Sequence, residues 1–148
     1  MKVLDCVGMV LKDKGGQIWF IGPDATVYEA LEVMADKGVG ALLVMQANSL
    51  MGVISERDYA RKVILHGLSS KTARVRDIMT SPALTIDMDT TVDDAMRLMT
   101  AHRLRHLPVI DGDGTVAGIV SIGDLVKWII TSHEQTIEQL ESYIAGRA

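Results

Sequence analysis

The chain alternates between helix-like and strand-like patterns of apolar residues, in an order that occurs twice. In the first half, Thr26 and Glu29 have the spacing of a capping box, which satisfies free backbone amides where a helix begins. An apolar stripe at helical spacing follows: Val27, Ala30, Leu31, Met34 and Ala35. The continuous apolar run 41–45 is typical of a strand covered on both faces. A second apolar run, 50–54, and a helical run, 55–66, complete this half.

The second half has the same order of patterns. Its expected elements are a short strand (83–86), a helix capped by Thr91, a strand (107–110), a hairpin turn (111–114), a further strand (116–120) and a helix from Asp124 onward. The first half also begins with a short strand, at 18–21. Each half therefore has the order strand, helix, strand, strand, helix.

The two halves are copies of one another. A shift of 65 positions places Thr26 on Thr91, and one additional residue in the second hairpin makes the later shift 66. The later shift aligns three polar or glycine positions: Gly52 with Gly118, Ser55 with Ser121, and Asp58 with Asp124. Because an internal repeat decides the fold, we predict an α+β protein in which two pseudo-twofold related β-α-β-β-α repeats pack through their sheets. The predicted boundaries are 1–17 for an N-terminal lead-in, 18–70 and 71–131 for the repeats, and 132–148 for a C-terminal helix.

Composition narrows the class of protein. Of the 148 residues 48% are hydrophobic, which supports a packed core, and the net charge of −4 argues against a nucleic-acid-binding surface. Cys6 is the single cysteine, so no internal disulfide can form and a reducing compartment is expected. No apolar run approaches the roughly 20 residues of a membrane helix, and the start of the chain has no signal-peptide pattern. We therefore expect a soluble, cytoplasmic protein.

A serine and an aspartate three positions apart stand at the same place in both copies, as Ser55 with Asp58 and Ser121 with Asp124. This spacing is itself a capping box, and capping is the commoner reason for it. Its position also favours a ligand site, because a helix that begins directly after a strand offers free amides and a positive dipole end to a phosphate. An aspartate there can accept the hydroxyls of a ribose. The repeat therefore predicts up to two such sites.

Longer phrases surround these motifs: Ser55-Glu56-Arg57-Asp58-Tyr59, Asp77-Ile78-Met79-Thr80, Arg105-His106-Leu107-Pro108-Val109 and Ser121-Ile122-Gly123-Asp124-Leu125-Val126. With them, residues from about 18 to 130 resemble a tandem pair of cystathionine-β-synthase (CBS) domains, also called a Bateman module. The phrases are similar to those of the small stand-alone subfamily. The resemblance implies a regulatory module that binds AMP, ADP, ATP or NAD(H) in the clefts between the domains and reports energy or redox state to a partner protein.

The same resemblance assigns roles to individual residues. Asp58 and Asp124 would hold ribose, and Ser55 and Ser121 would lie near phosphate. Further candidates are Arg57, Lys71, Arg105 and His106 for phosphate, and Met79 and Ile86 for adenine. Because Gly123 in the second motif takes the place of Arg57, the two sites are expected to differ in charge.

Positive charge is also concentrated locally in this acidic chain. Six of its fifteen basic residues lie within twenty positions: Arg57, Arg61, Lys62, Lys71, Arg74 and Arg76. A solvated helix face and loop is the commoner meaning of such a run.

Residue patterns for catalysis or metal binding are weak. His102 and His106 are four apart, but they lie across a helix end and a strand, so a shared metal face is not expected. Cys6 has no context for a nucleophile, and no carboxylates are paired for acid–base work. We expect no enzyme activity. The alternatives are a constitutive scaffold whose Ser-x-x-Asp motifs only cap helices, and an enzyme acting on a nucleotide.

The C-terminal segment carries an apolar stripe that needs a covering surface: Ile137, Leu140 and Ile144. Such a stripe on a lone helix is stable only when it is buried. The chain's own core or a second copy of the chain would serve, and we expect the second copy, which predicts a homodimer. The sequence names no regulated partner protein.

Overall fold

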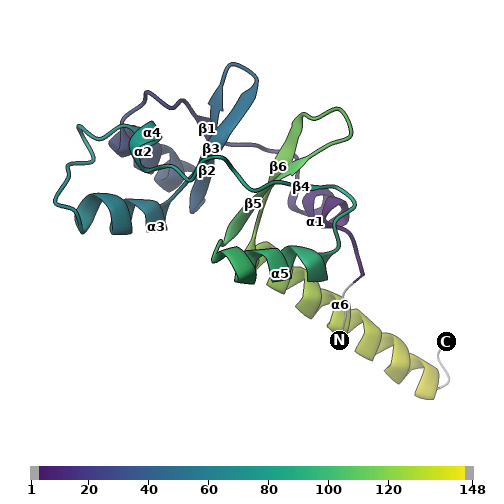
Figure 1. Ribbon diagram of the computed structural model, residues 1–148. Helices are drawn as coiled ribbons and strands as arrows, with labels where there is room; N and C mark the ends of the chain where they lie inside the picture. The colour runs from purple at the N-terminus through teal and green to yellow at the C-terminus, as the bar shows by residue number, and fades with distance from the viewer. Residues whose placement is uncertain (1–3, 146–148) are drawn as a thin grey trace.

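The computed structural model describes residues 4–145 and contains two similar halves side by side, each with a three-stranded sheet (Figure 1). The first half comprises β1 (Phe20–Ile21), α2 (Val27–Lys37), β2 (Ala41–Gln46), β3 (Ser49–Ser55), α3 (Glu56–Asp58) and the π-helical turn η1 (Tyr59–Ile64). The second comprises β4 (Ile86–Asp87), α5 (Val92–His102), β5 (His106–Ile110), β6 (Val116–Ser121) and α6 (Ile122–Ile144). Within each sheet the first pair of strands is parallel and the second antiparallel. The predicted α+β class, with two β-α-β-β-α repeats, is confirmed.

Helix capping follows the sequence signals in both repeats. The hydroxyl of Thr26 accepts a hydrogen bond from the backbone N–H of Glu29, and that of Thr91 accepts one from the N–H of Asp94, each at 3.1 Å. Helix α2 ends at Gly38, whose φ of 66° is left-handed and suits glycine. Local residue chemistry therefore fixes where these helices begin and where α2 ends.

The helix after Ser55 differs from the regular helix that the sequence predicts over 55–66. Only α3 is α-helical, and η1 continues it with wider turns, in which the N–H of Leu65 donates to the carbonyl of Ala60. A wider turn changes which residues face the core, and here Val63 is buried while Ile64 and Leu65 are exposed.

Each repeat is completed by the segment that precedes the other one. The lead-in helix α1 (Val7–Lys14) packs into the core of the second repeat, whereas α4 (Val75–Ile78), which precedes the second repeat, packs into the core of the first. The hydrogen bonds correspond: the N–H of Val7 donates to the carbonyl of Thr90 at 2.8 Å, and the N–H of Val75 donates to that of Ala25 at 2.9 Å. We call 5–14 and 73–82 the crossing arms.

The repeated glycine of the motif lies where each arm crosses a sheet. A Cβ on Gly118 would come within 3.0 Å of Leu11, and one on Gly52 would collide with the carbonyl oxygen of Thr80. Glycine is therefore required at position 52, where backbone fills the space of a β-carbon, while at position 118 a β-carbon would press on the flexible Leu11 side chain.

Helix α6 runs as one element through the predicted boundary at 132 and extends away from the body of the molecule (Figure 1). Its outer apolar side chains are exposed: Ile130, Ile137, Leu140 and Ile144. Residues 1–3 of the predicted lead-in and 146–148 of the predicted tail lie outside the described part of the chain. Within the described part, none of the helices combines the length and apolar character needed to span a membrane.

Candidate functional site: two unequal clefts between the repeats

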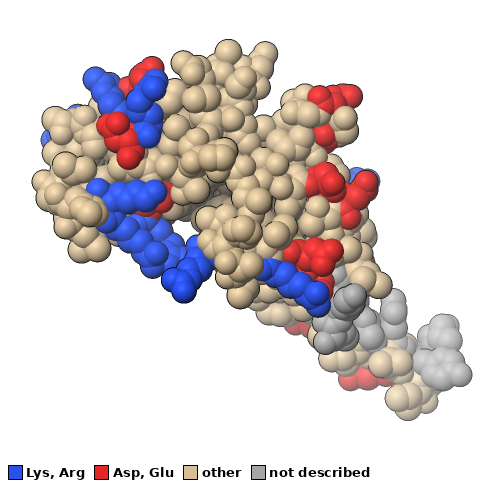
Figure 2. Space-filling model, in the orientation of Figure 1, with Lys and Arg blue, Asp and Glu red and all other residues tan. Residues whose placement is uncertain are grey.

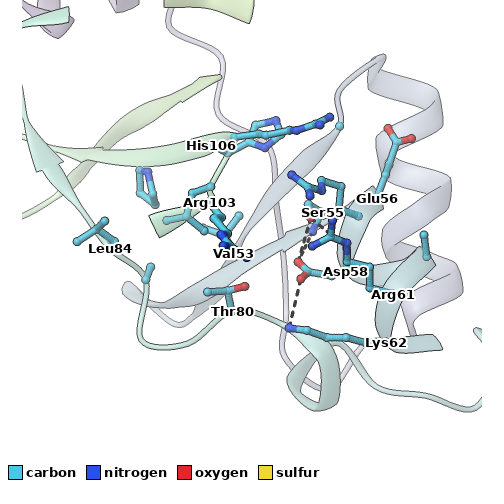
Figure 3. Close-up of a pocket in the computed structure, with 17 residues that line it drawn as sticks. Val53, Ser55, Glu56, Asp58, Arg61, Lys62, Thr80, Leu84, Arg103 and His106 are labelled. Carbon is cyan, nitrogen blue, oxygen red and sulfur yellow. Dashed lines mark hydrogen bonds and ion pairs between the residues drawn. The ribbon is translucent and has the colours of Figure 1, made fainter. Parts of the chain in front are cut away.

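A cleft of about 600 Å³ lies between the two repeats, and residues of both line it (Figure 3). The first repeat contributes residues 55–58 at the start of α3, and Arg61 and Lys62 of η1. The connection between the repeats adds Thr80, Ala83 and Leu84, and the second repeat adds residues 103–106 and Pro108. We call this the first cleft. Its volume falls in the range of small-molecule sites.

Ser55 and Asp58 form a reciprocal capping box at the edge of the first cleft (Figure 3). The N–H of Asp58 donates to Ser55 Oγ at 3.2 Å, while the N–H and the hydroxyl of Ser55 both donate to Asp58 Oδ2, at 2.9 and 3.0 Å. Asp58 Oδ1 lies 3.2 Å from Lys62 Nζ. Because each carboxylate oxygen can accept two hydrogen bonds, Oδ1 keeps capacity for one more donor, such as a ribose hydroxyl.

A second, smaller cleft of about 300 Å³ holds the other copy of the motif. It is lined by Trp19, Gly38, Gly40, Ser121 and Asp124 among others. The N–H of Asp124 donates to Ser121 Oγ at 3.1 Å, and the N–H of Ser121 donates to Asp124 Oδ2 at 2.8 Å. We call this the second cleft.

Lys14 of the lead-in arm occupies the second cleft. Its ammonium group donates to Asp124 Oδ2 at 2.8 Å and to the carbonyl of Ile119 at 3.0 Å. Burial raises the pKa of Asp124, but the hydrogen bonds from Lys14 and Ser121 outweigh it, so that this pKa lies below its ordinary value. The second carboxylate is therefore held ionised by a partner from a distant part of the chain.

His106 borders both clefts and is half-buried between them. Its pKa is lowered, first by burial and then by the charge of Lys14, with Asp124 opposing the shift. The imidazole is consequently neutral near physiological pH, and it lies at the shared wall of the two clefts.

The first cleft is strongly basic. Four arginines line it: Arg57, Arg61, Arg103 and Arg105. Within the described part of the chain none of the four makes an ion pair or a side-chain hydrogen bond. The pKa of Arg57 is lowered, chiefly by the charge of Arg61, so these groups repel one another. Figure 2 shows Lys and Arg side chains gathered between α3 and α5.

The structure brings some sequence-predicted residues together and leaves others apart. Ser55, Arg57, Asp58, Arg105 and His106 line the first cleft, and Ser121 and Asp124 line the second, together with His106. Three candidates lie elsewhere: Lys71, Met79 and Ile86. The Lys71 ammonium is 5.5 Å above the Tyr28 ring, Met79 packs on the first core, and Ile86 is buried in the second core.

The sequence reasoning did not include Arg61, Lys62 or Arg103 among the site residues. Arg61 and Lys62 belonged to the basic run, for which a solvated helix face and loop was the commoner interpretation. Arg103 had a detectable signal, because the shift of 65 places it on Gly38, the residue that ends α2.

Comparison with known proteins agrees with this architecture. The family model of the CBS domain matches residues 16–65 and 75–131. A mitochondrial CBS domain-containing protein of Arabidopsis thaliana, CBSX3, is 42% identical over 146 residues, which cover 93% of this chain and 70% of the relative. The CBS domain-containing protein YhcV of Bacillus subtilis is 32% identical over 109 residues, which cover 74% of this chain and 76% of the relative.

Solved structures show the same fold. A structure described as a putative signal-transduction protein with CBS domains, from Burkholderia ambifaria, is 46% identical with a TM-score of 0.81, covering 85% of this chain and 94% of that one. A CBS-domain containing protein of Agrobacterium tumefaciens is 35% identical with a TM-score of 0.77, and the match covers 82% of this chain and 97% of that one. The chain belongs to the CBS-domain family and carries a tandem pair of these domains, which together form a regulatory module.

Proposed function

We propose that the chain is a non-catalytic sensor that binds an adenine nucleotide, AMP, ADP, ATP or NAD(H), in the first cleft and passes its occupancy to a partner protein. The observation that supports this proposal most is the composition of the cleft. A carboxylate with spare acceptor capacity, Asp58, lies at a helix start beside four arginines that form no ion pair within the described residues. Ribose hydroxyls and phosphates are the groups that such a combination recognises.

Residues from both repeats would contact the same ligand. Ser55 and Asp58 come from the first repeat, and Arg105 and His106 from the second. A nucleotide bound between them stabilises the arrangement of the repeats in which all these contacts form. It can signal only by this preference for one conformation over another.

The competing proposal is a constitutive scaffold, and the complete capping box at Ser55 favours it. Asp58→Asn separates the two, because asparagine keeps an acceptor for the cap and removes the charge. For a sensor, we expect calorimetric titration to show an affinity for ATP or AMP lowered about tenfold, with helix content by circular dichroism unchanged. Asp124→Asn, the matched substitution in the second cleft, shows whether that cleft also binds.

Absence of saturable binding to wild-type protein that has been freed of co-purified nucleotide would contradict the sensor and leave the scaffold. Turnover of ATP or NADH by the same preparation would instead support an enzyme.

We further propose that the protein is a cytoplasmic homodimer; its regulated partner protein is not identified. The exposed apolar residues of α6 support the dimer, since a second copy would cover them. A structural neighbour from bloom-forming cyanobacteria, 26% identical with a TM-score of 0.74, is described as a hexameric CBS-CP12 protein.

A further inference from the structure

The two clefts differ in charge because three arginines of the first correspond to glycines in the other copy of the repeat. Arg103 and Arg105 align with Gly38 and Gly40, which line the second cleft. Arg57 aligns with Gly123 of the second motif. The first cleft thus receives its arginines from both repeats, while the equivalent positions around the second carry no side chain.

Arg103 occupies a backbone conformation that suits glycine. Its φ is 55°, close to the 66° of Gly38, and its N–H caps α5 by donating to the carbonyls of Met99 and Thr100. A residue with a β-carbon costs roughly 1 kcal/mol in this left-handed region. Arg103 is therefore unfavourable for the helix end itself. Its side chain lines the first cleft and has no ion pair among residues 4–145, and this place in the cleft accounts for its presence.

The charge of the first cleft exceeds what a monophosphate can balance. Five cationic side chains line it, four arginines and Lys62, against the two carboxylates of Glu56 and Asp58, which leaves three positive charges in excess. A phosphate monoester carries about 1.5 to 2 negative charges near neutral pH. A chain of two or three phosphates carries more, and its greater length offers oxygens to arginines of both repeats.

Building on the nucleotide site proposed above, we infer that the first cleft selects a nucleoside di- or triphosphate, ADP or ATP, over AMP and NAD(H). Arg57, Arg103 and Arg105 are the residues that determine this selectivity. Guanidinium groups form paired hydrogen bonds with phosphate oxygens, so each arginine can hold a different part of the phosphate chain. NAD(H) also has two phosphates, but each is esterified to a ribose, so neither has the second ionisation of a terminal phosphate and the pair carries less charge than that of ADP.

The test exchanges each arginine for the residue that the other repeat carries at that position. ATP, ADP, AMP and NADH are titrated by calorimetry, without divalent cations, into wild type, Arg57→Gly, Arg103→Gly and Arg105→Gly. We expect wild type to bind ATP and ADP at least about tenfold more tightly than AMP and NADH. Each substitution lowers the ATP affinity about tenfold and changes the AMP affinity less than about twofold. Arg103→Gly also keeps or raises the unfolding temperature.

Lys71→Ala is the control for unspecific charge effects, because Lys71 is exposed and lines neither cleft. It should leave all four affinities unchanged. Equal affinity of wild type for AMP and ATP, or a parallel loss of both in the glycine variants, would overturn the selectivity while the proposed nucleotide site stands. Absence of binding by all four nucleotides would overturn both.

Discussion

His106 shows at the scale of one residue how the two clefts influence each other. Charged groups face it from several elements: Lys14 of α1, Asp58 of α3, Arg105 at its own strand start and Asp124 of α6. Burial, Lys14 and Arg105 lower its pKa, and the two aspartates raise it. His106 lines the first cleft as well as the second. An anion bound in the first cleft therefore places negative charge near the imidazole and favours its protonated form.

A phosphate chain in the first cleft should raise the pKa of His106. Binding and protonation then favour one another, so the affinity for ATP increases as the pH falls from 8 to 6. Calorimetric titration across this range measures the effect, and the imidazole signals in NMR spectra report the pKa directly. In His106→Gln the affinity should vary less with pH. An unchanged imidazole pKa in the presence of saturating ATP would contradict the expectation.

At the scale of elements, the two crossing arms form different hydrogen bonds with equivalent strands, β3 in the first repeat and β6 in the second. In the first repeat, Thr80 of the arm pairs through its backbone with Val53, exchanging two hydrogen bonds at 2.9 and 3.1 Å. In the second repeat the equivalent of Val53 is Ile119, whose carbonyl accepts from the Lys14 ammonium instead. Helix α1 continues to Lys14, so the donor to the Ile119 carbonyl is the Lys14 side chain in place of a backbone N–H. The same ammonium group neutralises Asp124.

The contribution of Lys14 to this arm can be tested by replacing it and measuring how the free energy of unfolding depends on pH. Because the folded-state pKa of Asp124 is lowered, the stability it contributes is present above its unfolded pKa, near 3.8, and is lost as the pH falls through the folded value. In Lys14→Met the free energy of unfolding should fall by up to about 1 kcal/mol at pH 7, a modest value because the pair is partly exposed. The difference from wild type should shrink below pH 4, as measured by denaturant unfolding.

Lys12→Met on the same helix is the matched control, since Lys12 is exposed and forms no ion pair within residues 4–145. A loss of stability in Lys14→Met that is the same at pH 7 and at pH 3 would show that its methylene chain matters and its charge does not.

The features that the sequence predicted correctly depend on neighbours in the chain. Each helix cap joins a hydroxyl to a residue three positions away, at Thr26, Thr91, Ser55 and Ser121. The duplication in the sequence predicted the Ser-x-x-Asp motif at equivalent places in both repeats. Lys14 could not be assigned in this way, because its partner Asp124 is 110 positions distant and meets it only through the crossing of the arms.

Two further features were missed for different reasons. Arg103 was missed because it stands at a helix end, where glycine or asparagine is the usual residue and the direction of a side chain does not follow from the sequence. The wider turns of η1 were missed because three apolar residues in a row, Val63, Ile64 and Leu65, do not show which one is buried, and only Val63 is.

At the scale of the whole molecule, α6 and the groove beside it expose a run of apolar side chains that no other element of the described part of the chain covers. A groove of about 490 Å³ between α5 and α6 is lined by Met96, Ala101, Ile129 and polar neighbours. Leu140 is 58% exposed and Ile144 83% exposed farther along α6. An apolar surface of this kind on a regulatory domain is typical of an association face.

Leu140→Glu places a charge on that face without touching either cleft. We expect the proposed homodimer to dissociate, so that the mass measured by light scattering or sedimentation falls to that of one chain, while the ATP affinity at the first cleft is unchanged. Glu134→Gln, an exposed change on the same helix, serves as the control. A monomeric wild-type protein, or a dimer unaffected by Leu140→Glu, would contradict this assignment of the face.

The crossing arms carry a consequence for the ancestry of the molecule. An ancestor with a single repeat and a single arm would have met the same packing requirement only as two identical chains, each lending its arm to the other. In such a symmetric pair every substitution enters both clefts at once. In one chain that carries both repeats the same association is intramolecular, and the two copies no longer have to be identical. The two copies do differ, since arginines line the first cleft while the second has glycines at the equivalent positions and holds Lys14.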